Sequence, residues 1–166
     1  MSNSYALEKV EVALSPQQRF EEYLQSRGKR ITQQRRLIVD QVFSRHTHFD
    51  TDGLVEHLIA SGIGRRVSRA SVYRTLTELV AAGLLREMPL GGRTVYEHDY
   101  GYPQHDHLYC QKCEKLIEFS SEEVKQIRQA VARENQFRAT GHRLIIFGVC
   151  SECSQVKRPK RPLDLV

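Results

Sequence analysis

The sequence predicts an α+β fold in two parts, and three observations support this prediction. Apolar residues recur at helical spacing from Pro16 to about Ala82. Two strand-like runs then flank a turn that contains glycine, and beyond them the pattern changes to short strands around one helix. Because 166 residues are enough for two small domains, we expect a helical domain that ends in a β-hairpin, followed by a smaller α/β domain.

Four helices are expected in the first part. Leu54 and Leu58 show the spacing of one helical face, and glycines follow several of the apolar segments. The expected N-caps are Thr32, Asp50 or Thr51, and Ser68. The expected limits of the helices are Pro16 to Arg27, Thr32 to Arg45, Thr51 to Ser61, and Arg69 to Ala82.

The stretch after these helices predicts a β-hairpin. Residues 84–88 and 93–97 are strand-like, and Pro89, Leu90, Gly91 and Gly92 lie between them. Helices followed by such a hairpin are typical of a winged helix. We therefore assign residues 1–98 to a winged-helix domain, with residues 1–15 as an N-terminal extension.

Residues 99–103 show neither periodicity and carry Gly101 and Pro103, so we expect a hinge there. Residues 104–156 are expected to form the second domain, and residues 157–166 a basic, disordered tail. The expected elements of the second domain are strands from His105 to Cys110, Leu116 to Phe119 and His142 to Cys150, with a helix from Ser121 to Gln136.

The charge and the hydrophobicity pattern restrict the class of protein. A formal net charge of +5 suits a polyanionic partner such as nucleic acid. The first 15 residues lack the apolar run of a secretory signal, and no other stretch is apolar enough to cross a membrane. We therefore expect a cytoplasmic chain.

The four cysteines form two Cys-x-x-Cys pairs, Cys110 with Cys113 and Cys150 with Cys153. Disulfides have little use in the reducing cytosol, and two such pairs can supply four thiolates to one tetrahedral zinc ion. The alternative is a redox-active disulfide within each pair, but the chain lacks a thioredoxin-like βαβ pattern. A zinc ion with four protein ligands has no open position, so we expect it to stabilise a domain with a small hydrophobic core.

Histidines and carboxylates gather next to the first cysteine pair. On a strand, His105 and His107 project from one face and Asp106 from the other. Glu118 lies on the expected returning strand, and Glu97 ends the expected wing. Imidazole and carboxylate ligands suit Zn(II), Fe(II) or Mn(II) alike. The alternative is a set of surface histidines beside a zinc site.

The fourth expected helix has one apolar face and one face suited to DNA. Leu76 and Leu79 lie on the apolar side, whereas Tyr73, Arg74 and Thr77 lie on the flank and opposite side. Followed by a wing, this helix is expected to enter a major groove. An ordinary amphipathic surface helix is the alternative. A further set of arginines is expected to attract phosphates without sequence preference, namely Arg35, Arg36, Arg65, Arg66 and Arg69.

In this combination and order, the motifs resemble the ferric uptake regulator family of metal-dependent transcriptional repressors. The resemblance runs from about Arg30 to Cys153. The residues that carry it are Ala70-Ser71-Val72-Tyr73-Arg74-Thr75-Leu76, Gly91-Gly92-Arg93, Tyr96-Glu97, His105-Asp106-His107-Leu108-Tyr109-Cys110 with Cys113, and Ile117-Glu118-Phe119.

The resemblance implies a homodimer that binds a palindromic, double-stranded DNA operator through its winged helices. The second domain is then the dimerisation domain, and Arg30 approaches the minor groove. The resemblance also implies a regulatory metal at the hinge, with Fe²⁺ favoured over Zn²⁺ or Mn²⁺, because zinc sensors often add a cysteine to this site. The implied regulatory ligands are His48, Glu97, His105, His107 and Glu118.

Another site of the family is degenerate here. Gln104 and Lys125 stand where the family has histidine and glutamate. The possible remaining ligands are Asp106 and His142, with Glu122 or Glu123 as a substitute for the carboxylate that is lost at position 125.

Other functions are less consistent with the sequence. A zinc uptake regulator of the same family is the nearest alternative, and glutamates at positions 97 and 118 disfavour a peroxide sensor. A small zinc hydrolase would need a His-Glu-x-x-His helix or a recognisable general base, and neither is present. A zinc-ribbon interaction module would leave Tyr73 and Arg74 unexplained. We therefore expect a repressor and no enzyme.

Overall fold

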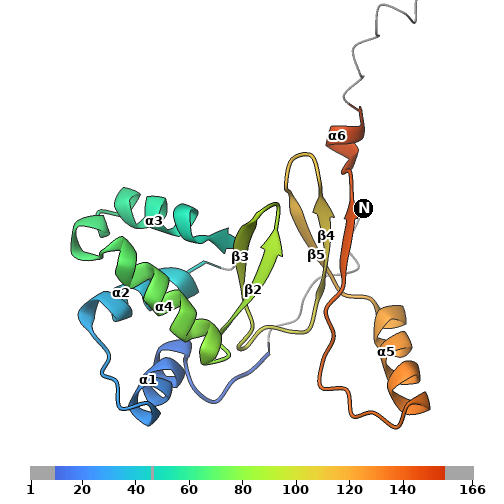
Figure 1. Ribbon diagram of the computed structural model, residues 1–166, viewed down its shortest axis with the longest axis horizontal. Helices are drawn as coiled ribbons and strands as arrows, with labels where there is room; N and C mark the ends of the chain where they lie inside the picture. Colours follow the sequence, from blue (N-terminus) through green and yellow to red (C-terminus); the bar gives the residue numbers. More distant parts are fainter. Residues whose placement is uncertain (1–9, 46, 156–166) are drawn as a thin grey trace, which may run out of the picture. The chain divides into compact units, whose positions relative to one another are not determined.

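The computed structural model describes residues 10–45 and 47–155 (Figure 1). The chain divides into two compact units, with the boundary between Pro103 and Gln104. Residues 1–9 of the expected N-terminal extension and the expected basic tail lie outside the described residues. No helix within the described ranges combines the length and the apolar character that crossing a membrane requires.

Three helices of the first unit begin at expected caps, with Asp50 rather than Thr51 at the third helix, and the cap of the first helix was not predicted. Ser15 and Gln18 form a capping box at the start of α1. The side-chain oxygens of Thr32, Asp50 and Ser68 accept hydrogen bonds from backbone N–H groups in the first turns of the next helices, which confirms these predictions. The helical elements are α1 (Pro16–Ser26), α2 (Gln33–Phe43), α3 (Thr51–Ala60), the short 3₁₀ helix η1 (Gly64–Arg66) and α4 (Arg69–Ala81).

An antiparallel sheet completes the first unit, in the order β1-β3-β2. Its strands are β1 (Phe49–Asp50), β2 (Leu85–Leu90) and β3 (Arg93–His98). The hairpin turn consists of Gly91 and Gly92 alone, with φ of 58° and 77°, so both positions favour glycine. The sequence predicted a longer turn, from Pro89 to Gly92. In the structure β2 continues through Pro89 to Leu90, because an edge strand tolerates proline.

The helices of the first unit pack around one hydrophobic core. Phe20 and Leu24 of α1 are fully buried, as are Leu76 and Leu79 on the predicted apolar face of α4. Residues from α2, α3 and the wing complete the same cluster, including Ile38, Val39, Val42, Leu54, Leu58, Leu84, Leu85 and Tyr96. The exposed face of α4 is therefore held on a packed support.

The second unit is a three-stranded sheet with one long helix. Its strands have the order β5-β4-β6, with β4 antiparallel to β5 and parallel to β6. Helix α5 lies in the connection between β5 and β6, as a parallel pair requires. The elements are β4 (Asp106–Cys110), β5 (Leu116–Phe119), α5 (Glu122–Glu134), β6 (Ile145–Gly148) and α6 (Ser151–Gln155). Strand β6 is shorter than predicted, and α6 was not predicted.

Candidate metal centres and nucleic-acid interface

The backbone of the second unit brings both Cys-x-x-Cys pairs to one place. Strand β4 ends at Cys110, and a tight turn follows in which Glu114 has a φ of 59° and its N–H donates to the Cys110 carbonyl. Cys150 lies just after β6, and Cys153 lies in α6. Because β4 and β6 are neighbours in the sheet, the two pairs meet at the same end of it.

The four sulfur atoms form a compact group. All four lie within 4.8 Å of one another, and the Sγ atoms of Cys113 and Cys150 are 3.7 Å apart. All four cysteines are free thiols in the structure, so the alternative of a disulfide within each pair is not supported. Four sulfur donors at this spacing fit a structural zinc site.

The electrostatics of the quartet also call for a cation. The backbone N–H of Cys150 donates to the Cys110 sulfur at 3.3 Å and is the main cause that lowers the pKa of Cys110 to about 6. In contrast, the sulfurs of Cys113 and Cys150 raise the pKa of Cys153 to about 12. One thiolate is thus favoured by the backbone, whereas the full set of four thiolates requires a nearby positive charge.

Three further donors meet within the second unit. His105 lies just before β4 and His107 lies in it, with their ring centroids 4.8 Å apart. Glu118 on β5 stands opposite His107 in the strand register. Each of the three offers a ligand atom within 4.8 Å of the others, and both histidines are buried. The hairpin therefore brings these residues together as predicted, and they offer only nitrogen and oxygen.

Two donors meet within the first unit. Strand β1 pairs Phe49 with Tyr96 of β3, so His48 arrives beside Glu97, and their Nε2 and Oε2 atoms are 3.5 Å apart. The Glu97 side chain is 4% exposed, and its other oxygen lies 3.6 Å from Nη1 of Arg86. A buried carboxylate needs positive charge nearby, so Glu97 is suited to hold a cation together with His48.

In the degenerate site, Asp106 and His142 pair through their side chains, whereas Glu122 pairs elsewhere. His142 Nε2 lies 3.0 Å from Oδ1 of the buried Asp106. Gln104 Nε2 donates to the carbonyl oxygen of His142 at 3.0 Å. Glu122 forms an ion pair with Lys125 at 3.3 Å. Among the described residues, Asp106 and His142 belong to no group of three or more potential ligands.

Helix α4 presents the residues expected to contact DNA. Tyr73 is 47% exposed, and Arg74 and Thr77 are also exposed. Arg74 Nε donates to the carbonyl oxygen of Ala70, and Thr77 Oγ1 donates to that of Tyr73. Both side chains are thus steadied by their own helix on the solvent side.

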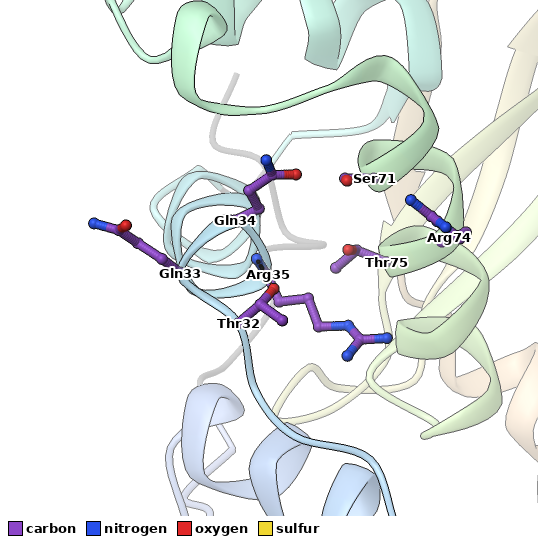
Figure 2. A pocket seen from close by; sticks show the side chains of 7 residues that line it. All are labelled: Thr32, Gln33, Gln34, Arg35, Ser71, Arg74 and Thr75. Carbon is purple, nitrogen blue, oxygen red and sulfur yellow. Dashed lines mark hydrogen bonds between the residues drawn. The ribbon is translucent and has the colours of Figure 1, made fainter.

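A groove of about 530 Å³ lies between the start of α2 and α4 (Figure 2). Its lining residues are Thr32, Gln33, Gln34, Arg35, Ser71, Arg74 and Thr75. Three of the arginines expected to attract phosphate are paired with carboxylates of the same unit: Arg35 with Glu78, Arg36 with Glu21 and Arg69 with Asp52. Arg65 and Arg66 lie in η1.

The chain is similar to known proteins in sequence and in structure. A sequence model described as the ferric uptake regulator family matches residues 26–147. The ferric uptake regulation protein of Neisseria gonorrhoeae is 34% identical over 133 residues, which cover 78% of this chain and 90% of that protein. The corresponding protein of Legionella pneumophila is 40% identical over 111 residues, covering 66% of this chain and 79% of that protein.

A solved structure agrees as well. The ferric uptake regulator of Pseudomonas aeruginosa with manganese has a TM-score of 0.67 to this chain at 27% sequence identity. The match covers 78% of this chain and 96% of that one.

Proposed function

The chain belongs to the ferric uptake regulator family of metal-responsive transcriptional repressors, and on that premise we propose that iron is the metal to which it responds. In this proposal it binds a palindromic operator as a homodimer when its regulatory site holds Fe²⁺. The observation that carries the proposal is the distribution of donors: His48 and Glu97 meet in the first unit, and His105, His107 and Glu118 in the second.

The four cysteines would hold a structural zinc ion. When bound, zinc supplies the positive charge that lets Cys153 ionise beside the other sulfurs. The second unit buries few apolar residues, so this cross-link between the end of β4 and α6 would stabilise its sheet. Cys110, Cys113, Cys150 and Cys153 therefore have a structural role in the proposal, and regulation belongs to other residues.

The five histidines and glutamates would form the regulatory site. A divalent cation shared by donors from both units would favour one orientation of the winged helix relative to the dimerisation domain. The cation shifts the equilibrium between orientations only to the extent that it binds one orientation more tightly than the others. An orientation that sets two recognition helices at the spacing of two operator half-sites would couple iron concentration to repression.

The ligand types are compatible with iron and lack the thiol that would select zinc. All five donors are imidazole nitrogens or carboxylate oxygens, which suit Fe²⁺ and Mn²⁺ as well as Zn²⁺. The four cysteines are grouped with one another, so no thiol is left to add the soft ligand that would select zinc. The nearest alternative within the family is a zinc or manganese sensor.

DNA contacts are assigned to α4 and to the segment before α2. Tyr73, Arg74 and Thr77 would face the major groove, where arginine can read guanine and an aromatic ring can meet a thymine methyl group. Arg30, which is exposed, would approach the minor groove. A repressor of this kind acts where the DNA is, in the cytoplasm, whose reducing conditions also preserve the cysteine thiolates.

The apolar surface of the second unit supports a homodimer. On α5, Ile127 is 64% exposed and Val131 is 54% exposed, and no residue of this helix is buried. Leu108 and Ile146 on adjacent strands are exposed as well. This much apolar surface on a small unit favours burial against a second copy of the chain.

Anaerobic titration of the purified full-length chain with Fe²⁺, Mn²⁺ and Zn²⁺ tests the proposal. The readout is fluorescence anisotropy of a duplex selected by the protein from a random library, at fixed salt. We expect Fe²⁺ to increase DNA affinity at buffered free concentrations. Each metal is titrated separately, because a site of nitrogen and oxygen donors generally binds Zn²⁺ more tightly than Fe²⁺. DNA affinity that ignores all three metals would exclude the switching mechanism.

A variant tests the assignment of the regulatory ligands. His105→Ala removes one donor of the second unit without touching the cysteines. We expect metal-stimulated DNA binding to be lost while the dimer, measured by analytical ultracentrifugation, persists. His57→Ala is the matched control, because His57 forms a hydrogen bond with Gln41 within the first unit and belongs to neither ligand set, so we expect the response to be unchanged. Loss of the folded dimer in His105→Ala would instead assign this residue a structural role.

A further inference from the structure

The guanidinium of Arg35 joins two segments of the first unit. Its Nη1 donates to the carbonyl oxygen of Arg30 at 2.8 Å, and its Nη2 lies 2.9 Å from both carboxylate oxygens of Glu78. In Figure 2 the Arg35 side chain extends from α2 towards α4, the helix that carries Glu78. The side chains of Arg35 and Glu78 are only 21% and 12% exposed. Arg35 is thus engaged on both sides within its own unit.

Glu78 also binds the side chain of Lys29, the residue that precedes Arg30. Lys29 Nζ donates to Glu78 Oε1 at 2.9 Å, and the Lys29 backbone N–H donates to the Leu24 carbonyl at 2.8 Å. The backbone at Arg30 is therefore fixed from α1, from α2 and from α4. The Arg30 side chain remains exposed.

We propose that Arg35 and Glu78 are positioning residues for DNA binding: together they form a brace that holds the Arg30 backbone, and they do not contact DNA themselves. This inference rests on the proposed DNA-binding function. With the backbone fixed in advance, the loss of its conformational freedom occurs on folding rather than on binding. The Arg30 guanidinium is then presented to the duplex from a rigid base.

The charges of the brace separate this proposal from simple phosphate attraction. Glu78 compensates the positive charge of Arg35, so this arginine adds little net attraction for phosphate. A Glu78→Gln change removes a negative charge from a DNA-binding unit, and by attraction alone it should strengthen DNA binding. The brace predicts the opposite result, because the amide holds Arg35 and Lys29 less strongly than the carboxylate does.

The test measures operator affinity of the metal-loaded full-length chain by anisotropy, with the selected duplex. We expect Arg35→Lys and Glu78→Gln each to lower affinity by about five- to tenfold, because ordering the Arg30 segment then opposes binding. Arg35→Lys keeps the charge but cannot bridge a carbonyl and a carboxylate. The matched controls are Arg19→Lys, whose arginine pairs with Glu22 on α1, and Glu56→Gln, on the exposed side of α3, and neither should weaken binding.

Combination with Arg30→Ala gives the decisive comparison. If the brace acts through Arg30, then Arg35→Lys causes no further loss in the Arg30→Ala background. Arg30→Ala alone should reduce the slope of log affinity against log salt by about 1, whereas Glu78→Gln should leave the slope unchanged. Three results would each overturn the proposal. The first is a loss in the double variant equal to the product of the losses from Arg30→Ala and Arg35→Lys. The others are wild-type affinity in Arg35→Lys and increased affinity in Glu78→Gln.

A measurement without DNA separates this inference from the proposed function. Amide hydrogen exchange in residues 29–32 should speed up in Arg35→Lys and Glu78→Gln relative to the two controls. Unchanged exchange would overturn the brace even if the protein binds DNA. Absence of metal-dependent DNA binding by the wild-type chain would instead contradict the proposed function, while the exchange result still decides whether the brace exists.

Discussion

The two units of this protein differ in how far their apolar residues are buried. In the first unit, Phe20, Leu24 and Leu76 are fully buried in one continuous core. In the second unit α5 has no buried residue, and Ile127 and Val131 lie on its surface. The first unit can therefore fold around its own core. In the proposed function, the second unit would gain stability from the zinc cross-link and from a second copy of the chain, so DNA binding and assembly would belong to units with different sources of stability.

The largest expected effect is the loss of the zinc cross-link. In Cys113→Ser, we expect the second unit to unfold while the first unit stays folded, because only the second depends on the metal. Zinc content measured by atomic absorption should fall, and limited proteolysis should leave a resistant fragment that ends near Pro103.

Gln111→Ser is the matched control for this prediction, because it alters an exposed position of the same turn. It should retain zinc and resist proteolysis as the wild type does. A Cys113→Ser chain that keeps its full length under protease would show that the second unit is stable without the cross-link.

The next effect tests the core of the first unit. Leu76→Ala removes a fully buried side chain and should lower the free energy of unfolding by about 2–5 kcal/mol. Urea denaturation should show this loss at every protein concentration, since the core lies within one chain. Thr77→Ala, on the exposed side of α4, should change stability by less than about 0.5 kcal/mol. Equal losses in the two variants would contradict the assignment of Leu76 to the core of the first unit.

A similar truncation on α5 should act on assembly instead. Ile127→Ala should weaken the dimer by about tenfold in dissociation constant, because the exposed side chain is assigned to the subunit interface. Analytical ultracentrifugation over a dilution series measures this change. Gln129→Ala lies on another face of α5 and should leave the constant unaltered. A dimer indifferent to Ile127→Ala would place the interface elsewhere.

The smallest expected effect concerns the cap of α3. Asp50→Ala should lower stability by about 1 kcal/mol at neutral pH, since the carboxylate accepts from the Gly53 N–H and pairs with Arg93. The Gly53 hydrogen bond is the main cause that lowers the pKa of Asp50, so its contribution exists above the unfolded pKa of about 3.9.

This contribution should disappear as the pH falls through the lowered pKa of Asp50. Thermal unfolding of the wild type and Asp50→Ala should therefore differ at pH 7 and converge in strong acid. A difference that persists unchanged below the folded-state pKa would mean that the carboxylate charge is not responsible.

Local features of the fold could be predicted from the sequence, and features that depend on long-range pairing could not. The caps Thr32 and Ser68 act within one turn, so the residue types were sufficient, and for α3 they left only Asp50 or Thr51. The extent of β2 was underestimated because Pro89 suggested a turn. Strand β1 has two residues and no periodicity, and it exists only through its pairing with β3.

The same distinction applies to the candidate sites. The cysteine pairs are short motifs, and strand alternation brought His105, His107 and Glu118 together correctly within the second unit. His48 came only from the family resemblance, because the β1–β3 register sets its position beside Glu97. Arg35 resembled any other surface arginine in the sequence. Its engagement with Glu78 depends on residues far along the chain.

The short strand β1 also limits how the chain can change in length. Three consecutive residues have three separate tasks: His48 meets Glu97, Phe49 stacks on Tyr96, and Asp50 caps α3. Inserting or deleting one residue in this segment would shift these side chains relative to Glu97, Tyr96 and α3. In a chimeric sensor, residues 48–50 should therefore be transplanted together with β3. Point substitutions at neighbouring positions would not change the register of this segment.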